Sequence, residues 1–574
     1  MSPHARVFSE TGEEPPRNHV SLRIIAQDPS VKGDDGLILD AWARVPWQRM
    51  AAGPRTSRFH VVDFDASTGR LVEHPMLPEH AFANADDETL VKSFEFHAQH
   101  VYAVAARTLA TFENALGRRL PWGFEGHQIY VVPHAFAEAN AYYSTEDRAL
   151  LFGYVPGHEG TVYTCLSHDV VAHETTHAVL DGLRRRFLEP GLPDQAAFHE
   201  GFADIVALLS LFSLQEVVEQ CLGAADKDGR IAVADVEREK LREGALTGVA
   251  EQLGRVLTHG RGALRQSALN APPDDWADDP AFLHPHRRGE VLVAIVLDVL
   301  IDLWIIRLNP LLAPDQGRPT RTLDRERAAE EGSRAAQHLL TMMIRGLDYL
   351  PPVEFEFADL IDAVLLADSE VAPDDDLHYR DLLQRRFAKS GIVPAPRTST
   401  SLLTGEFEPQ YGGINYAALR TDPDEVFRFL WQNAAEFAID TSMYLSVESV
   451  WPSQRVGPDG LIVIESVANY VQLLNLTAAE FMERSGRSLP DSIAPTTPLQ
   501  IIGGGTLVFD QFGRAKLHIS KPIDDWPRQA RRLVHLDRTG AIDREGRLGF
   551  SDGTSPGQAF AQLHDASIMS GEIW

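Results

Sequence analysis

Two short helical segments constrain the fold of this chain more than any other feature of its sequence. The first, SHDVVAHETTHAVLDGL at residues 167–183, carries His173 and His177 four residues apart in an otherwise largely apolar run. On a helix, residues i and i+4 project from the same face. Two imidazoles placed in this way can bind one zinc ion, at Zn–N distances of about 2.0–2.1 Å. The spacing therefore predicts a helix built around a metal ion.

Glu174 directly follows His173, so its carboxylate can reach a water molecule that the metal activates. Zinc lowers the pKa of such a water to about 7, and a nearby carboxylate can then act as general base. Ser167 is the expected N-cap of this helix. The H-E-x-x-H string is short, and on its own it leaves open that His173 and His177 are ordinary polar residues of a helix face.

The second segment is the apolar helix FHEGFADIVALLSLF at residues 198–212, which follows Pro190 and Pro193. Here Glu200 and Asp204 are again i and i+4, so both can face the first helix. Burying two carboxylates on an apolar helix is costly without partners, and a metal site supplies them. We therefore predict Glu200 as the third zinc ligand, and Asp204 as the acceptor for the second ring N–H of a ligand histidine.

At these motifs the sequence resembles the thermolysin-like gluzincin zinc metallopeptidases. DVVAHETTHAV is similar to the zinc helix of that family, and HEGFADI to its glutamate-ligand helix. NAYYSTEDRALLFG at residues 140–153 resembles the substrate-binding edge strand, and residues 96–120 resemble the helix before it. The likeness covers roughly residues 94–215 and extends more loosely to about residue 390. The chain as a whole resembles a non-secreted member of this family that carries an extra carboxy-terminal domain.

The resemblance implies an α+β fold: a two-lobed zincin catalytic unit, with zinc in the cleft between a mixed β-sheet lobe and a mainly helical lobe. It also implies a zinc-dependent metalloendopeptidase that hydrolyses internal peptide bonds. In this reading Zn²⁺ is the cofactor, and Glu174 takes a proton from the attacking water and passes it to the leaving amine. His173, His177 and Glu200 would hold the metal, and Asp204 would orient His173.

The resemblance also implies substrate contacts. Asn140 and Ala141 would bind the substrate backbone, and His286, in FLHPHRRGEVLVAIV, would be the second oxyanion donor, with His284 and Arg288 as rivals. One departure from the family concerns the other oxyanion donor. Where the family has a tyrosine, this chain reads RRRFLEP, so that role is vacant or filled elsewhere.

Two alternatives to the endopeptidase remain open. The first is a catalytically silent zincin-fold protein that binds or regulates a partner. The second is a gluzincin aminopeptidase, because HEGFA also resembles the glutamate helix of those enzymes. Cys165, on the approach to the zinc helix, is interpreted as a buried free cysteine, and His97 and His100 are interpreted as structural residues of an amphipathic helix.

Composition limits the partners. The 574 residues contain 53 Lys and Arg against 82 Asp and Glu, a formal charge of −29, so the chain repels polyanions. We therefore expect a protein or peptide substrate, and neither nucleic acid nor membrane as a partner. Two cysteines exclude a disulfide framework. The amino terminus lacks the pattern of a signal peptide, and residues 291–306 are too short for a membrane span, so we expect a cytoplasmic protein with a specific intracellular substrate.

The pattern along the chain predicts five parts. These are a flexible tail (1–18), a β-rich lobe that ends in the zinc helix (19–180), a helical lobe that carries the third ligand (181–390), a linker (391–405) and an α/β or α+β carboxy-terminal domain of unknown role (406–574). In the last part, residues 448–455 and 460–476 suggest a strand and a helix, and residues 498–523 a hairpin. A protein partner could bind through this domain.

Overall fold

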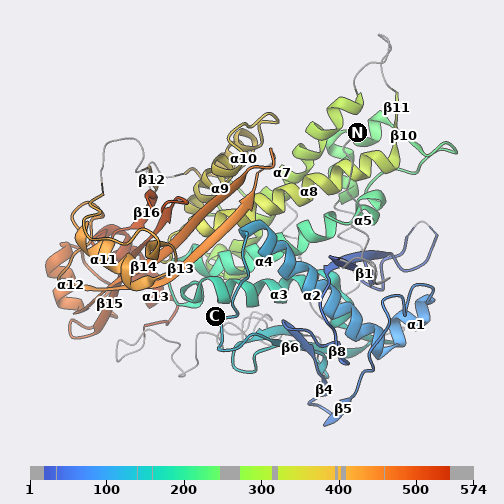
Figure 1. Ribbon diagram of the computed structural model, residues 1–574, viewed down its shortest axis with the longest axis horizontal. Coiled ribbons are helices and arrows are strands. Elements are labelled where there is room, and N and C mark those ends of the chain that lie inside the picture. Colours follow the sequence, from blue (N-terminus) through green and yellow to red (C-terminus); the bar gives the residue numbers. More distant parts are fainter. Residues whose placement is uncertain are drawn as a thin grey trace, which may run out of the picture.

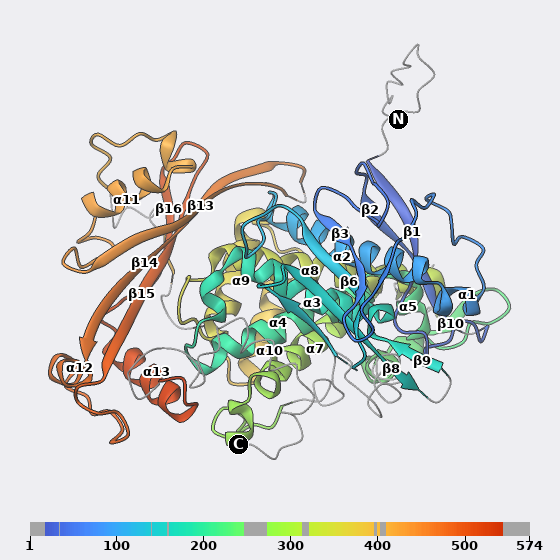
Figure 2. The ribbon, with the colours of Figure 1, turned by 90° about the horizontal axis from the view of Figure 1, so that it is seen from below.

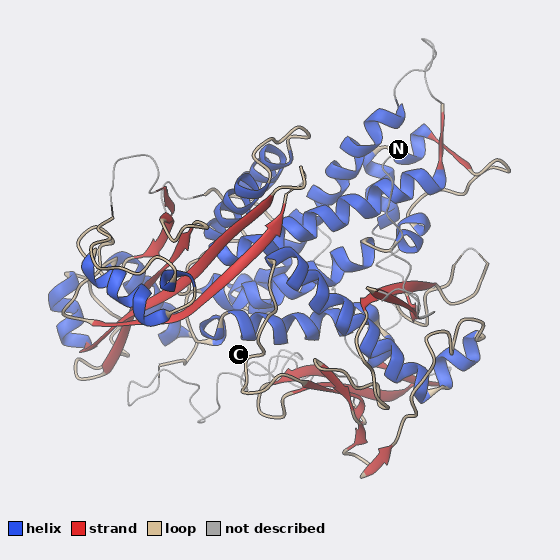
Figure 3. Cartoon of the chain, in the orientation of Figure 1, coloured by secondary structure: helices blue, strands red, loops and turns tan. Residues whose placement is uncertain are grey.

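The computed structural model describes residues 18–542, apart from residues 34, 139, 158–159, 246–271, 313–320, 395–398, 402–408 and 458. Most of the predicted tail and much of the predicted linker therefore lie outside the described residues. A strand-rich part, a body of long helices and a second sheet follow one another along the chain (Figures 1 and 3). The helices lie between the amino-terminal strands and the carboxy-terminal sheet (Figure 2). The predicted α+β class is confirmed.

The amino-terminal part consists of small sheets packed on one long helix. The hairpin of β1 (His19–Ile25) and β2 (Asp40–Pro46) is antiparallel. A second sheet has the order β3-β6-β8-β7, with β9 added on β8. Its strands are β3 (Phe59–Val61), β6 (Ile129–Phe136), β7 (Ala141–Ser144), β8 (Ala149–Gly157) and β9 (Gly160–Tyr163). The remaining elements are β4 (Asp63–Asp65), β5 (Arg70–Val72), α1 (Asp87–Lys92) and α2 (Phe94–Leu116).

Helix α2 shows how local sequence sets the limits of an element. It begins after Ser93, whose side chain accepts the backbone N–H of Phe96 at 3.2 Å. It ends at Gly117, which has a left-handed φ of 67°. Its apolar residues, among them Val101, Val104, Leu109 and Phe112, are buried, because β1, β2, α3 and α8 all pack on the helix.

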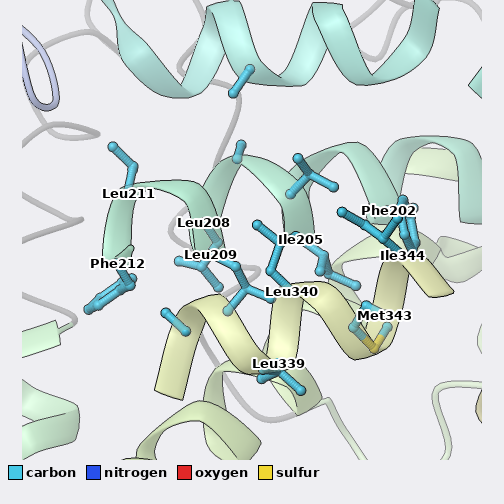
Figure 4. Packing of buried hydrophobic residues seen from close by; sticks show 14 of the residues in the cluster. Phe202, Ile205, Leu208, Leu209, Leu211, Phe212, Leu339, Leu340, Met343 and Ile344 are labelled. Carbon is cyan, nitrogen blue, oxygen red and sulfur yellow. The ribbon is translucent and has the colours of Figure 1, made fainter. Parts of the chain in front are cut away.

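The central body is a set of helices around one continuous hydrophobic core. Phe202, Ile205 and Leu209 of α4 lie against Leu340 and Met343 of α8 (Figure 4), and all five are fully or almost fully buried. The helices are α3 (His168–Leu183), α4 (Pro193–Phe212), α5 (Gln215–Gln220), α7 (Pro285–Leu312), α8 (Arg325–Gly346), α9 (Phe357–Val371) and α10 (Tyr379–Lys389). The short strands β10 (Arg230–Ala232) and β11 (Thr322–Asp324) pair beside them.

The carboxy-terminal part contains a five-stranded sheet of order β12-β16-β15-β14-β13, in which every pairing is antiparallel. This region is therefore of the α+β kind, and the expectation of an α/β domain is wrong for the described residues. Its strands are β12 (Ser399–Ser401), β13 (Tyr444–Val456), β14 (Ile462–Thr477), β15 (Pro498–Phe509) and β16 (Ala515–Lys521). Its helices are α11 (Pro423–Gln432), α12 (Ala478–Ser485) and α13 (Trp526–Arg538).

Two expectations about this sheet had different outcomes. The hairpin predicted for residues 498–523 is confirmed as β15 and β16. The helix predicted near residues 460–476 is wrong, because this stretch is the single strand β14. Its first residues, Ile462, Val463 and Ile464, are β-branched, its centre is buried on both faces, and it pairs with β13 on one side and β15 on the other.

A buried charge network joins this sheet to the helical body. Asp348 accepts two hydrogen bonds from the Arg118 guanidinium, each at 2.6 Å, and also pairs with Arg455 of β13. Arg455 in turn donates to Glu465 of β14 at 2.9 Å. The side chains of Asp348, Arg455 and Glu465 are at most 2% exposed. Removing any one partner would therefore leave a buried charge uncompensated.

Candidate metal centre

Helix α3 carries the H-E-x-x-H string in a buried position, between α2 and α4. His173, Glu174 and His177 are exposed by 4%, 3% and 0%. Ser167 precedes the helix as expected, but the predicted side-chain cap is wrong. Its hydroxyl donates instead to Asp28 at 2.6 Å, which ties the start of the helix to the segment after β1.

Helix α4 begins at Pro193, five residues earlier than the sequence pattern predicts, because proline is well suited to the first turn of a helix. It packs along α3, and this contact brings the two predicted motifs together. Glu200 and Asp204 both face α3: Asp204 Oδ1 lies 2.8 Å from His173 Nδ1, and Glu200 lies beside both histidines. The i and i+4 spacing therefore places these carboxylates as predicted.

The ring nitrogens of the two histidines converge. His173 Nε2 and His177 Nε2 are 2.8 Å apart. The Glu200 carboxylate lies 3.7 Å from the first nitrogen and 3.9 Å from the second. Glu174 has a carboxylate oxygen within 4.8 Å of both histidine ligand atoms. Two imidazoles and two carboxylates thus surround one point between α3 and α4.

The donor set fits a zinc ion. Since Asp204 can only accept when ionised, His173 Nδ1–H donates to it, and the lone pair of the neutral ring is then on Nε2, toward His177. With both rings neutral, two nitrogen lone pairs would oppose each other at this point, and a positive charge between them, a proton or a metal ion, relieves that opposition. Burial disfavours a charge on His173, but the Asp204 hydrogen bond and the charges of Asp204, Glu174 and Glu200 raise its pKa to about 9. The surroundings therefore favour positive charge.

His199 is a member of this centre that the sequence analysis did not identify. Its Nδ1 lies 2.8 Å from Nδ1 of His177, and the two rings stack at a centroid distance of 4.8 Å. When it accepts from His177 Nδ1–H, it fixes the His177 tautomer with the lone pair on Nε2, as Asp204 does for His173. The only local signal was its position next to Glu200 in FHEGF.

Glu174 is connected to the edge strand of the sheet. The backbone N–H of Tyr143 in β7 donates to Glu174 Oε2 at 3.0 Å. The Tyr143 hydroxyl donates to Asp181 at 2.8 Å, one helical turn beyond His177. Strand β7 therefore runs beside α3, and Glu174 lies between the histidine pair and this strand.

Asn140 and Ala141 lie at the start of the same strand. The Ala141 N–H bonds the Asn140 side-chain oxygen at 3.0 Å, and the Asn140 carbonyl accepts the N–H of Gly153 at 2.8 Å. Among the described strands, β7 pairs with β8 alone, so it forms an edge of its sheet. An edge strand is a site where an extended peptide can add by backbone hydrogen bonds.

His286, in the first turn of α7, also reaches the centre. Its Nδ1 lies 2.9 Å from Glu200 Oε2, and the neighbouring His284 ring stacks on it at 5.5 Å. Arg288, the other rival, is turned away and pairs with Asp194 at 2.5 Å. Of the three residues considered for the second oxyanion donor, His286 thus contacts the predicted ligand Glu200, whereas Arg288 pairs with Asp194.

The segment that follows α3, which contains Arg184 and Phe187, makes its contacts away from the candidate metal centre. Phe187, at the place where the resemblance expects a tyrosine, is buried against Phe198 and Phe355. Arg184 is buried and donates to the Leu347 carbonyl at 3.0 Å. Arg184 and residues of β13 line a cavity of about 560 Å³, whose lining contains none of the predicted site residues.

A buried H-E-x-x-H helix beside a sheet with a free edge is the arrangement typical of zinc-dependent metallopeptidases. Residues 56–181 match the family described as thermolysin metallopeptidase, catalytic domain. The match includes β7 and the residues His173, Glu174 and His177, and it ends before α4. The predicted resemblance to thermolysin-like zincins is confirmed, and the match supports a zinc metallopeptidase. No curated protein matches the chain.

None of the helices in the described part of the chain is long and apolar enough to cross a membrane. Helix α7 contains the most apolar stretch, and Asp298 and Asp302 within it pair with Arg238.

Proposed function

We propose that this chain is a zinc-dependent metalloendopeptidase that hydrolyses internal peptide bonds of a specific protein substrate. The observation that carries the proposal is the convergence of His173 Nε2, His177 Nε2 and the Glu200 carboxylate, with Glu174 beside them. His173, His177 and Glu200 would hold the ion. When bound, zinc supplies Lewis-acid chemistry, which polarises the scissile carbonyl and acidifies the attacking water.

Glu174 is the proposed general base. The Tyr143 N–H holds its Oε2, which orients the carboxylate next to the histidine pair. Glu174 accepts the proton of the attacking water and later delivers it to the leaving nitrogen. Glu200 lies against His286 and Asp204 lies against His173, so Glu174 is the carboxylate to which we assign this transfer.

The substrate would bind as an added strand along β7, with Asn140 and Ala141 at the start of that edge. Backbone hydrogen bonds would then provide affinity, and pockets for alternate side chains would provide specificity. Binding in the middle of an extended peptide favours internal cleavage. We propose His286 as the donor that stabilises the oxyanion, because its ring adjoins Glu200.

We also propose the domain limits 19–180, 181–390 and 406–574, a cytoplasmic location and a protein partner for the last domain. Aromatic side chains exposed on that region, Tyr416, Trp431, Tyr444 and Phe512, support a role in protein binding.

Mass spectrometry of the products tests the function. The purified full-length chain with zinc is incubated with denatured proteins and with peptides blocked at the amino terminus. Internal cuts that disappear in Glu174→Gln support the proposal. Release of single amino-terminal residues would assign an aminopeptidase instead, and absence of cleavage with zinc bound would assign a binding protein.

A further inference from the structure

A second cluster of metal-binding side chains lies in the amino-terminal part. His97 of α2, His134 of β6 and Cys165, just before α3, offer ligand atoms that all lie within 4.8 Å of one another. Their exposed fractions are 0%, 3% and 0%. The cluster is made of other residues than the candidate metal centre, and three distant segments of the chain contribute to it.

The hydrogen bonds around the cluster determine where the ring protons are. His97 Nε2 lies 2.8 Å from the carbonyl oxygen of Val91, which can only accept, so Nε2 carries the hydrogen. His134 Nδ1 lies 2.7 Å from Asp63 Oδ1, so it donates to this carboxylate. In their neutral forms, both rings therefore have their lone pair on the other nitrogen.

Those other nitrogens face each other. His97 Nδ1 and His134 Nε2 are 2.8 Å apart, a distance at which two lone pairs repel unless a positive charge lies between them. The same signature occurs in the candidate metal centre, where His173 Nε2 and His177 Nε2 are also 2.8 Å apart. There too the opposite nitrogen of each ring lies against a side chain, Asp204 or His199.

Asp63 supports this arrangement from outside. It accepts from His134 on one oxygen and lies 2.9 Å from His74 Nε2 on the other. Two imidazole contacts on one buried carboxylate favour its ionised form. An ionised carboxylate that orients a histidine from behind is the usual partner of a metal-ligating imidazole.

We propose that His97 Nδ1, His134 Nε2 and Cys165 Sγ form a second site, for zinc or a similar thiophilic divalent cation. Two imidazoles and one thiolate are a ligand set typical of zinc. A tetrahedral zinc ion separates such ligand atoms by roughly 3.3–3.6 Å, so small side-chain shifts from the observed contacts suffice. The charges of the Cys165 thiolate and Asp63 together balance a divalent cation.

The cluster can also be interpreted without a metal ion, and in that interpretation the Cys165 thiol has no role. A proton between His97 and His134, with Asp63 as counter-charge, would also satisfy the two nitrogens. The Cys165 side chain is fully buried, and an apolar, buried place favours the neutral thiol when no metal is bound. A bound cation deprotonates it outright. Thiolate ligation is thus the property that separates the two interpretations.

The place of the site suggests its role. Cys165 belongs to the short turn Thr164–Leu166, three residues before the start of α3. Metal binding there would fasten this turn to α2 and β6, and so fix the position from which α3 begins. The rings of Phe94 and Tyr163 lie over the two histidines, at centroid distances of 4.2 Å from His134 and 4.7 Å from His97.

The side chains of Phe94 and Tyr163, which cover the cluster, are both partly exposed. The second site is therefore buried but close to the surface.

Cobalt titration of the chelator-stripped full-length chain tests the proposal. The candidate metal centre offers nitrogen and oxygen ligands alone, so thiolate-to-cobalt charge transfer in the near ultraviolet would come from a cysteine site. We expect this band in the wild type and in His177→Ala, and its loss in Cys165→Ser. Cys221→Ser is the matched control, because Cys221 is a second buried thiol, whose Sγ bonds the Val217 carbonyl at 3.4 Å.

Elemental analysis after zinc loading gives the second readout. The wild type should hold about two zinc ions per chain, and Cys165→Ser and His177→Ala about one each. Circular dichroism checks that each variant is folded, and His97→Gln replaces Cys165→Ser if the latter is not. A wild type without the thiolate band, or a band that persists in Cys165→Ser, would overturn the second site. Loss of zinc in His177→Ala alone reports on the peptidase site.

Discussion

The Nδ1 of His286 lies 2.9 Å from Oε2 of Glu200, so the first turn of α7 touches the carboxylate proposed as third metal ligand. From this position the imidazole can either stabilise the oxyanion of the reaction or merely hold Glu200 in place. The two roles predict different consequences when the ring is removed.

If His286 stabilises the oxyanion, we expect His286→Ala to lower kcat by roughly 10²–10³-fold, which is the usual effect of losing one such donor. Zinc content and KM should change little. The measurement is steady-state kinetics on a cleaved peptide, with elemental analysis of the same samples. His284→Ala, which removes the ring stacked on His286, is the control. Loss of zinc from His286→Ala would mean that the residue positions Glu200 instead.

Glu174→Gln should bind zinc like the wild type and lose hydrolysis, because the amide cannot take the proton of the attacking water. General-base catalysis contributes about 10²–10⁴-fold, so kcat should fall by at least this order. Glu200→Gln removes the carboxylate on the other side of the histidines. This variant should lose zinc affinity in addition to hydrolysis. Glu174→Gln with retained activity would exclude Glu174 as the base.

Two variants of His199 distinguish between a role in orienting His177 and a role in packing alone. His199→Leu removes the acceptor for His177 Nδ1 and should weaken zinc binding by about 10–100-fold, as the loss of such partners does. His199→Asn keeps a polar group there and should retain most of the affinity. Competition with a zinc chelator of known affinity measures both. Equal affinities for the two variants would show that His199 only fills space.

The candidate metal centre was readable from the sequence because its information is local. His173 and His177, and likewise Glu200 and Asp204, are one helical turn apart, and the helix period alone places each pair on one face. The second cluster could not be predicted in this way. His97, His134 and Cys165 lie on a helix, a strand and a turn, and no spacing relates them until the sheet packs on α2.

Two of the wrong predictions, the helix at residues 460–476 and the Ser167 side-chain cap, failed because they too depend on contacts between distant parts of the chain. The run at residues 460–476 has apolar residues at spacings that suit either a helix or a strand, and pairing with β13 and β15 decides the outcome. Ser167 has the right type and position for a cap, but Asp28, 139 residues earlier in the chain, takes its hydroxyl. In both cases a tertiary contact outweighs a local preference.

The Asp348 network allows a prediction about stability. Asp348→Asn leaves Arg118 and Arg455 with less compensation in a buried place, and such losses cost on the order of 3–5 kcal/mol in the free energy of unfolding. Urea unfolding, followed by fluorescence, measures the difference. Glu88→Gln is the control, since its partner Lys92 is exposed on the surface and such pairs contribute little.

The same network predicts a pH dependence. Burial raises the pKa of Asp348, but the charges of Arg118, Arg455 and Arg184 and the Arg118 hydrogen bonds outweigh it and lower the pKa to about 2. In the unfolded chain an aspartate has a pKa of about 3.9. The stabilisation is therefore complete above about pH 4 and is lost as the pH falls through about 2. The difference in unfolding free energy between wild type and Asp348→Asn should shrink over this window. A difference that stays constant down to pH 2 would contradict the ionised pairing of Asp348.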